Sequence, residues 1–199
     1  RVPDSREVAK AHKDLPLSEI QLLLNSKIHE ERFVGLVILI SRFKVAHNKK
    51  SLDLKAQKEI FDFYMKNLYA QRINNWDLID STAPYLGYYL IGKPGTSKLL
   101  NQLAASESLW ERRAAVMFTF AFIREFELDD TLRLCKKLLN DPHDLMHKAC
   151  GWMLRELGKQ DLGALREFLD ANVKKMPRTM LRYAIEKMSE RERKDWLKR

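Results

Sequence analysis

Apolar residues recur at the helical period of about 3.6 residues along almost the whole chain, and no stretch sustains the period of two that is typical of a half-buried strand. The stripe formed by Phe33, Leu36, Val37 and Ile40 is representative, and comparable stripes continue as far as Met188. With 7 glycines and 6 prolines in 199 residues, the chain lacks the turn residues that a β-sandwich or barrel needs. The sequence therefore predicts an all-α fold.

Polar breaks divide these stripes into about twelve helices joined by short links. If these helices form successive pairs, the second helix of each pair has a basic or aromatic residue just before its run of apolar residues. These residues are Arg32, Trp76, Arg113, Lys148 and Arg182. They stand 34 to 44 residues apart, which is the repeat length of HEAT-like or armadillo-like proteins. We therefore expect a single domain over residues 1–199, a right-handed solenoid of HEAT-like antiparallel helix pairs with a concave basic groove.

The net charge of +9, from 36 basic and 27 acidic side chains, points to an acidic partner: nucleic acid, an anionic membrane or an acidic protein. The excess is +4 in residues 1–108 and +5 in residues 109–199, so a basic surface has to be assembled by folding. No apolar run reaches the roughly 18 residues of a membrane span.

Cys135 and Cys150 are the only two cysteines, and both stand in apolar helical stretches. This usage predicts buried free thiols in a reducing, cytoplasmic compartment. The segment that contains His143 and His147 is similar to a zinc-protease motif. Asp144, however, is shorter than the usual glutamate and no third ligand is evident, so we expect neither a metal nor a cofactor.

Trp76 and Asp80 are the most suggestive pair of side chains. They are four residues apart, so on a helix they lie one turn apart on the same face, with Asn74 or Asn75 as the N-cap. A carboxylate beside an indole at a helix start is unusual for pure packing. Tryptophan is nevertheless often a core residue, and Asp80 could instead cap the segment that follows. The residues alone leave both interpretations open.

Three ordered blocks carry a family resemblance: NNWDLIDSTAPYLG at 74–87, LWERRAAVMF at 109–118 and HKACGWMLRELGK at 147–159. Together with the opening RVPDSRE, they resemble the AlkD-type DNA alkylation repair proteins, a family of HEAT-like alkylpurine DNA glycosylases. The resemblance covers essentially the whole chain. It implies hydrolysis of the N-glycosidic bond of positively charged N3- or N7-alkylated purines in double-stranded DNA.

The resemblance also implies roles for individual residues. Asp80 matches the catalytic carboxylate. The residues that match DNA- or lesion-binding positions are Trp76, Arg113, Trp152, Lys148 and Arg155. We expect a monomer in the cytoplasm with access to a bacterial-type nucleoid, acting on alkylated double-stranded DNA without a membrane, a metal or a cofactor.

The chain departs from the family pattern in two respects. Asn75 stands where the family often has a second tryptophan, and the chain begins at Arg1, where the family usually has preceding helices, so we expect upstream helices to be missing. Two other functions therefore stay open. One is a HEAT-like protein that binds DNA structures without catalysis, and the other is a HEAT scaffold that binds an acidic protein.

Overall fold

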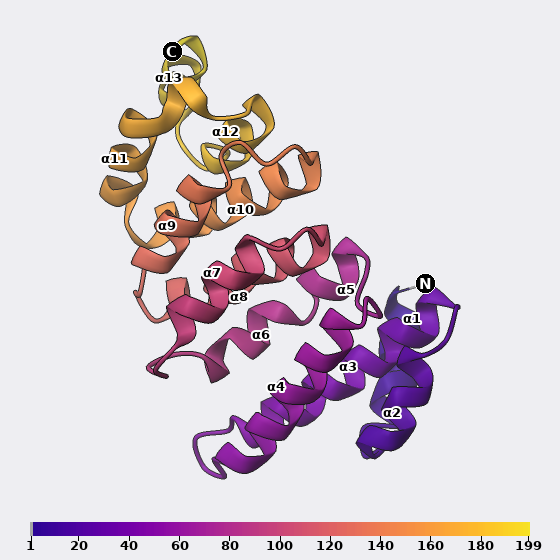
Figure 1. The fold of residues 1–199 in the computed structure, drawn as a ribbon. Helices are drawn as coiled ribbons and strands as arrows, with labels where there is room; N and C mark the ends of the chain where they lie inside the picture. Colours follow the sequence, from indigo (N-terminus) through magenta and orange to yellow (C-terminus); the bar gives the residue numbers. More distant parts are fainter. Residues whose placement is uncertain (1) are drawn as a thin grey trace. The chain divides into compact units, whose positions relative to one another are not determined.

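The computed structural model describes residues 2–199, and this part of the chain is built from helices without any β-strand. The predicted all-α fold is confirmed (Figure 1). The helices gather into two compact units, one that ends at Leu90 and one that begins at Ile91. None of the described helices combines the length and the apolar character that crossing a bilayer requires.

The first unit is organised around one long apolar helix. Its elements are α1 (Val2–Ala11), α2 (Leu17–Leu24), α3 (His29–Ala46), α4 (Leu54–Tyr69), α5 (Trp76–Asp80), α6 (Ala83–Leu86) and the 3-10 turn η1 (Gly87–Tyr89). Helix α3 packs against α1, α2, α4, α5 and α6. Leu36, Ile38 and Leu39 of α3 are completely buried, because α3 is covered on several sides. The short helices α5 and α6 are thus anchored on the central helix of the unit.

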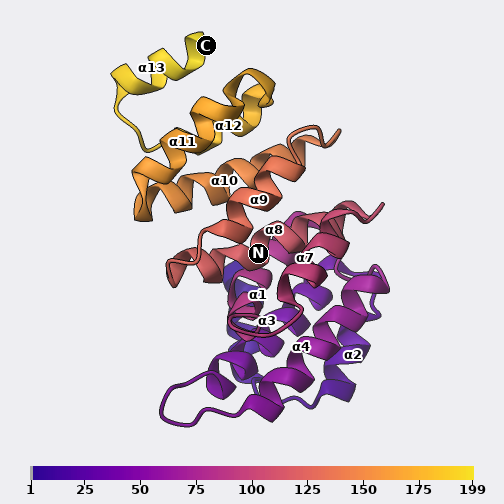
Figure 2. The same cartoon turned by 60° about the vertical axis from the view of Figure 1, so that its left-hand side comes forward.

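The second unit is a succession of helix pairs. Its elements are α7 (Thr96–Ala104), α8 (Leu109–Arg124), α9 (Asp129–Lys137), α10 (Asp144–Gln160), α11 (Leu162–Asn172), the 3-10 turn η2 (Val173–Lys175), α12 (Arg178–Ala184) and α13 (Glu190–Lys198). Helix α7 packs on α8 and α9 on α10, while α8 packs on α10 and α10 on α12 (Figure 2). Arg113 lies on α8, Lys148 on α10 and Arg182 on α12, one on each of these three helices, as the repeat spacing predicts. The right-handed turn and the basic groove stay predictions.

Gly151 sets how closely α10 and α12 approach each other. A Cβ atom at this position would lie 2.5 Å from the Cβ of Tyr183 and 2.6 Å from the backbone oxygen of Met180. Because a backbone oxygen cannot move without its helix, only glycine fits here. The glycine in the sequence KACGWML is therefore required by helix packing, and it brings α12 against the helix that carries Lys148 and Trp152.

Cys135 and Cys150 are buried free thiols, as predicted. The Cys135 Sγ donates a weak hydrogen bond to the carbonyl oxygen of Cys150 over 3.6 Å. A side-chain hydrogen bond with Cys150, together with burial, raises the pKa of the Cys135 thiol well above its usual value.

We expect neither thiol to react with a disulfide reagent such as DTNB in the folded protein. Both are inaccessible, and Cys135 stays protonated at neutral pH, whereas the thiolate is the reactive form. Following the absorbance of the released thionitrobenzoate with and without denaturant tests this. Two thiols should titrate in denaturant, and rapid reaction of the native protein would contradict the burial of the pair.

Candidate functional site

The side chains of Trp76 and Asp80 occupy the first and last positions of α5, a five-residue helix. The Oδ1 of Asn75 accepts a hydrogen bond from the backbone N–H of Trp76 over 2.7 Å, which confirms the prediction of an asparagine cap and identifies it as Asn75. Trp76 is 51% exposed, and Asp80 is half-buried. An indole that is half in solvent contributes little to the core, and its role in binding stays a prediction.

The first turn of α3 holds α5 in place. The Nε2 of His29 lies 2.7 Å from the Oδ2 of Asp77, and Nη1 of Arg32 donates to the Oδ1 of Asn74 over 2.6 Å and to the carbonyl oxygen of Arg72 over 3.3 Å. A helix of one turn is not stable by itself, so these contacts fix the position of Trp76. They join residues 40 to 48 positions apart, and no local sequence pattern signals them.

A buried hydroxyl pair lies below the other end of α5. Thr82 Oγ1 donates to the carbonyl oxygen of Leu78 over 2.6 Å and is hydrogen-bonded to the hydroxyl of Tyr64 over 3.0 Å. Burial raises the pKa of Tyr64 above its usual value, the bond with Thr82 lowers it, and the negative charge of Asp80 raises it. The phenol of Tyr64 therefore stays neutral at neutral pH.

Arg113 of α8 is 4% exposed. Its Nη1 donates to the backbone carbonyl oxygen of Leu145, in the first turn of α10. Part of its role is thus to tie α8 to α10. Because Arg113 is buried, the basic residues on α8, α10 and α12 do not form a uniformly exposed row. The proposed contact of Arg113 with DNA stays a prediction.

Lys148, Trp152 and Arg155 share one face of α10, since they are four and three residues apart. Lys148 Nζ lies 2.8 Å from Asp144 Oδ2, with the two side chains 41% and 55% exposed. This hydrogen bond raises the pKa of Lys148 and lowers that of Asp144. An exposed pair of this kind is weak, so Lys148 can exchange the carboxylate for a phosphate.

Trp152 and Arg155 are held more firmly than Lys148. Trp152 is half-buried, its Nε1 donates to Glu156 Oε1 over 3.1 Å, and its ring is tilted against that of Phe120 at 6.4 Å. Arg155 is 17% exposed, pairs with Glu186 through Nη1 and lies 3.5 Å from Glu156 through Nε. To bind a phosphate, Arg155 would have to leave these carboxylates.

The two histidines that resemble a zinc motif are engaged in local contacts. His143 Nδ1 accepts from the backbone N–H of Leu145 over 3.1 Å, and His147 Nε2 lies 2.6 Å from the carbonyl oxygen of Asp141. Within residues 2–199, no three His, Cys, Asp or Glu side chains are grouped as metal ligands.

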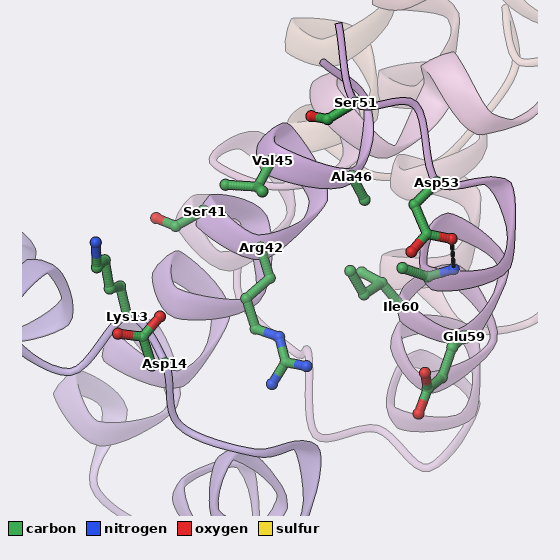
Figure 3. Close-up of a pocket in the computed structure, with 11 residues that line it drawn as sticks. Lys13, Asp14, Ser41, Arg42, Val45, Ala46, Ser51, Asp53, Glu59 and Ile60 are labelled. Atoms are coloured by element: carbon green, nitrogen blue, oxygen red, sulfur yellow. Dashed lines mark hydrogen bonds between the residues drawn. The ribbon is translucent and has the colours of Figure 1, made fainter. Parts of the chain in front are cut away.

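The first unit also contains a cavity of about 500 Å³ between the α1–α2 link, the end of α3 and the start of α4 (Figure 3). Arg42 projects into it, and Nη1 of Arg42 donates to the carbonyl oxygen of Leu15 over 2.5 Å. Asp53, on its rim, caps α4 by accepting from the backbone N–H of Ala56. None of the six predicted site residues lines this cavity.

No curated protein is similar enough to the chain to be matched with it. The family model described as DNA alkylation repair enzyme, in contrast, matches residues 1–188. It spans both units and includes every predicted site residue. The chain therefore belongs to the family of DNA alkylation repair enzymes.

Proposed function

We propose that the protein is a DNA glycosylase that hydrolyses the N-glycosidic bond of N3- or N7-alkylated purines in double-stranded DNA. The observation that carries this proposal is the exposed indole of Trp76, held one helical turn from the carboxylate of Asp80. Membership of the DNA alkylation repair family makes DNA the substrate class.

The chemistry needs little from the protein at the leaving group. A purine alkylated at N3 or N7 is positively charged, and it becomes neutral when it departs with the electron pair of its bond to C1′. The sugar then becomes a cation that resembles an oxocarbenium ion. A carboxylate beside this cation stabilises it, as in glycoside hydrolysis. Asp80 is the candidate for this role.

Water completes the reaction. Its oxygen forms the new bond to C1′, and the proton that it loses passes to Asp80 or to solvent. The indole of Trp76 offers an electron-rich face to the positively charged sugar. Among the predicted site residues of the second unit, Lys148 is the best placed by its exposure and weak ion pair to hold a phosphate, which contributes affinity without reading the base sequence.

The proposal is tested by incubating the protein with duplex DNA that contains 7-methylguanine or 3-methyladenine and measuring the released base by chromatography. Release well above the spontaneous rate, with no release of unmodified guanine, is expected. Binding to the duplex without release above the spontaneous rate would instead support the non-catalytic DNA-binding function. Failure to bind DNA together with binding to an acidic protein would support the scaffold function.

Replacing Trp76 by alanine is expected to slow base release about 5- to 30-fold, the range that corresponds to losing a cation–π contact of about 1 to 2 kcal/mol. The melting temperature should change little, because half of the side chain is already in water. Tyr69→Ala is the matched control, since Tyr69 is a 52% exposed aromatic residue of the same unit. Equal rates for Trp76→Ala and Tyr69→Ala would show that the indole takes no part.

A further inference from the structure

The positive charge of the chain is concentrated at its C-terminal end. Residues 174–199 contain ten basic and four acidic side chains, so this segment supplies +6 of the net charge of +9. The segment comprises the last residues of η2 together with α12 and α13. Such a local excess creates a positive potential that a polyanion can use.

The acidic side chains of this segment are all occupied. Each of them lies within ion-pair distance of a basic side chain: Glu186 with Arg155 and Lys187, Glu190 with Lys194, Glu192 with Arg166, and Asp195 with Lys198. Six exposed basic side chains of the same segment make no ion pair with any described residue. They are Lys174, Lys175, Arg178, Arg182, Arg191 and Arg193, which we call the C-terminal basic surface.

One hydrogen bond joins the two helices, α12 and α13, that carry four of these six side chains. Arg178 and Arg182 are four residues apart on α12 and therefore share a face. Arg178 Nη2 donates to the carbonyl oxygen of Leu197 over 2.7 Å, which joins the start of α12 to the end of α13. Arg193 lies one helical turn before Leu197 on α13. This contact brings the unpaired charges of α12 and α13 near one another in the second unit.

This surface continues toward α10. Helices α10 and α12 are in close contact at Gly151, and hydrogen bonds from Lys148 and from Thr179 of α12 lower the pKa of Asp144. Lys148, the best-exposed basic site residue of α10, therefore lies beside α12. A DNA backbone bound at Lys148 therefore lies next to the C-terminal basic surface within this unit.

We propose that the C-terminal basic surface binds the phosphates of duplex DNA, beyond the residues that match the lesion site. The choice of DNA as the polyanion rests on the proposed function. The family match ends at residue 188, so Arg191 and Arg193 of α13 lie outside it. Phosphate contacts of this kind are independent of sequence, and they allow a repair enzyme to bind undamaged DNA while it moves toward a lesion.

Helix α13 is held in place without using these two arginines. Its Trp196 is 5% exposed, and the guanidinium of Arg199 lies 4.1 Å from the centre of the indole ring. Glu192 is bound by Arg166 over 2.8 Å, and Arg199 by Asp170 over 2.6 Å, both partners belonging to α11. Neutralising Arg191 and Arg193 should therefore leave the helix docked.

The test is a variant in which Lys174, Lys175, Arg191 and Arg193 are replaced by glutamine. Its affinity for a short unmodified duplex, measured by fluorescence anisotropy over a range of salt concentrations, should fall at least about tenfold at low salt. The slope of log K against log salt should become shallower by about 3 to 4, because each phosphate contact contributes about 0.9. The control removes four other exposed lysines, Lys49, Lys50, Lys55 and Lys66, and should keep the slope of the parent.

An unchanged slope in the first variant, with native circular dichroism, would overturn the proposal. So would loss of binding to vesicles of phosphatidylcholine and phosphatidylglycerol in equal parts with duplex binding retained, because the surface would then serve a membrane. Base release is measured separately with methylated duplex at saturating concentration, where the variant should match the parent. A parent that releases no base but shows the slope difference would contradict the glycosylase alone and support the basic surface.

Discussion

Replacing Asp80 by asparagine is expected to slow the release of 7-methylguanine about 100-fold or more while the affinity for duplex DNA changes less than about twofold. Asparagine keeps the size of the side chain but removes the negative charge that stabilises the cationic sugar, and such electrostatic contributions are typically worth two to three orders of magnitude. Single-turnover release at saturating protein measures the chemical step, and anisotropy measures the affinity.

Asp62→Asn is the matched control for this substitution. Asp62 is an exposed carboxylate of α4 in the same unit, paired with Lys58 over 2.5 Å, so its loss removes the same charge from a different place. The control should release base at the rate of the parent. If Asp80→Asn also keeps the parental rate and melting temperature, Asp80 is not the catalytic carboxylate.

The features that sequence reasoning predicted well are those set by short-range physics. The helical period identified the all-α fold, because an apolar stripe can be recognised from residues that are close together in the sequence. Helix α5 could be predicted with its cap, because Asn75 accepts a hydrogen bond from the N–H of the next residue, Trp76. Trp76 and Asp80 are in turn only one helical turn apart. The burial of Cys135 and Cys150 likewise followed from the apolar stretches in which they stand.

Contacts between distant parts of the chain could not be predicted in this way. The pairing of His29 with Asp77 depends on how α5 packs on α3, and that of Arg155 with Glu186 on how α12 packs on α10. The burial of Arg113 has the same origin, because only the α8–α10 contact brings the Leu145 carbonyl to it. One-dimensional spacing assigns a residue to a helix but does not say whether its charge is already neutralised.

The distribution of charge can be obtained from the sequence, but only when segments much shorter than half of the chain are compared. Residues 1–108 and 109–199 have nearly equal excesses, and this equality hides the +6 of residues 174–199. Which of those charges remain unpaired is again a matter of packing, since Glu192 is taken by Arg166 of another helix. The net charge therefore suggested a class of partner, and the pairing pattern suggests where that partner binds.

Replacing Asp141 by alanine is expected to lower the free energy of unfolding by about 3 to 5 kcal/mol, because it leaves a buried guanidinium without its carboxylate. Arg112 Nε lies 2.7 Å from Asp141 Oδ2, and the two side chains are 14% and 3% exposed. Arg112 keeps its hydrogen bonds to the carbonyl oxygens of Ser106 and Glu107, which places the effect toward the lower end of that range. Urea denaturation followed by circular dichroism measures it.

The loss should also reach α10, the helix that carries Lys148, since Asp141 Oδ1 accepts from the backbone N–H of His143, just before α10. Asp195→Ala is the control: Asp195 is 58% exposed and 4.0 Å from Lys198, and an exposed pair of this kind contributes less than about 1 kcal/mol. Equal stability for Asp141→Ala and Asp195→Ala would contradict the buried pair. A destabilised Asp141→Ala with an unchanged salt dependence of DNA binding would show that DNA binding does not depend on how α10 begins.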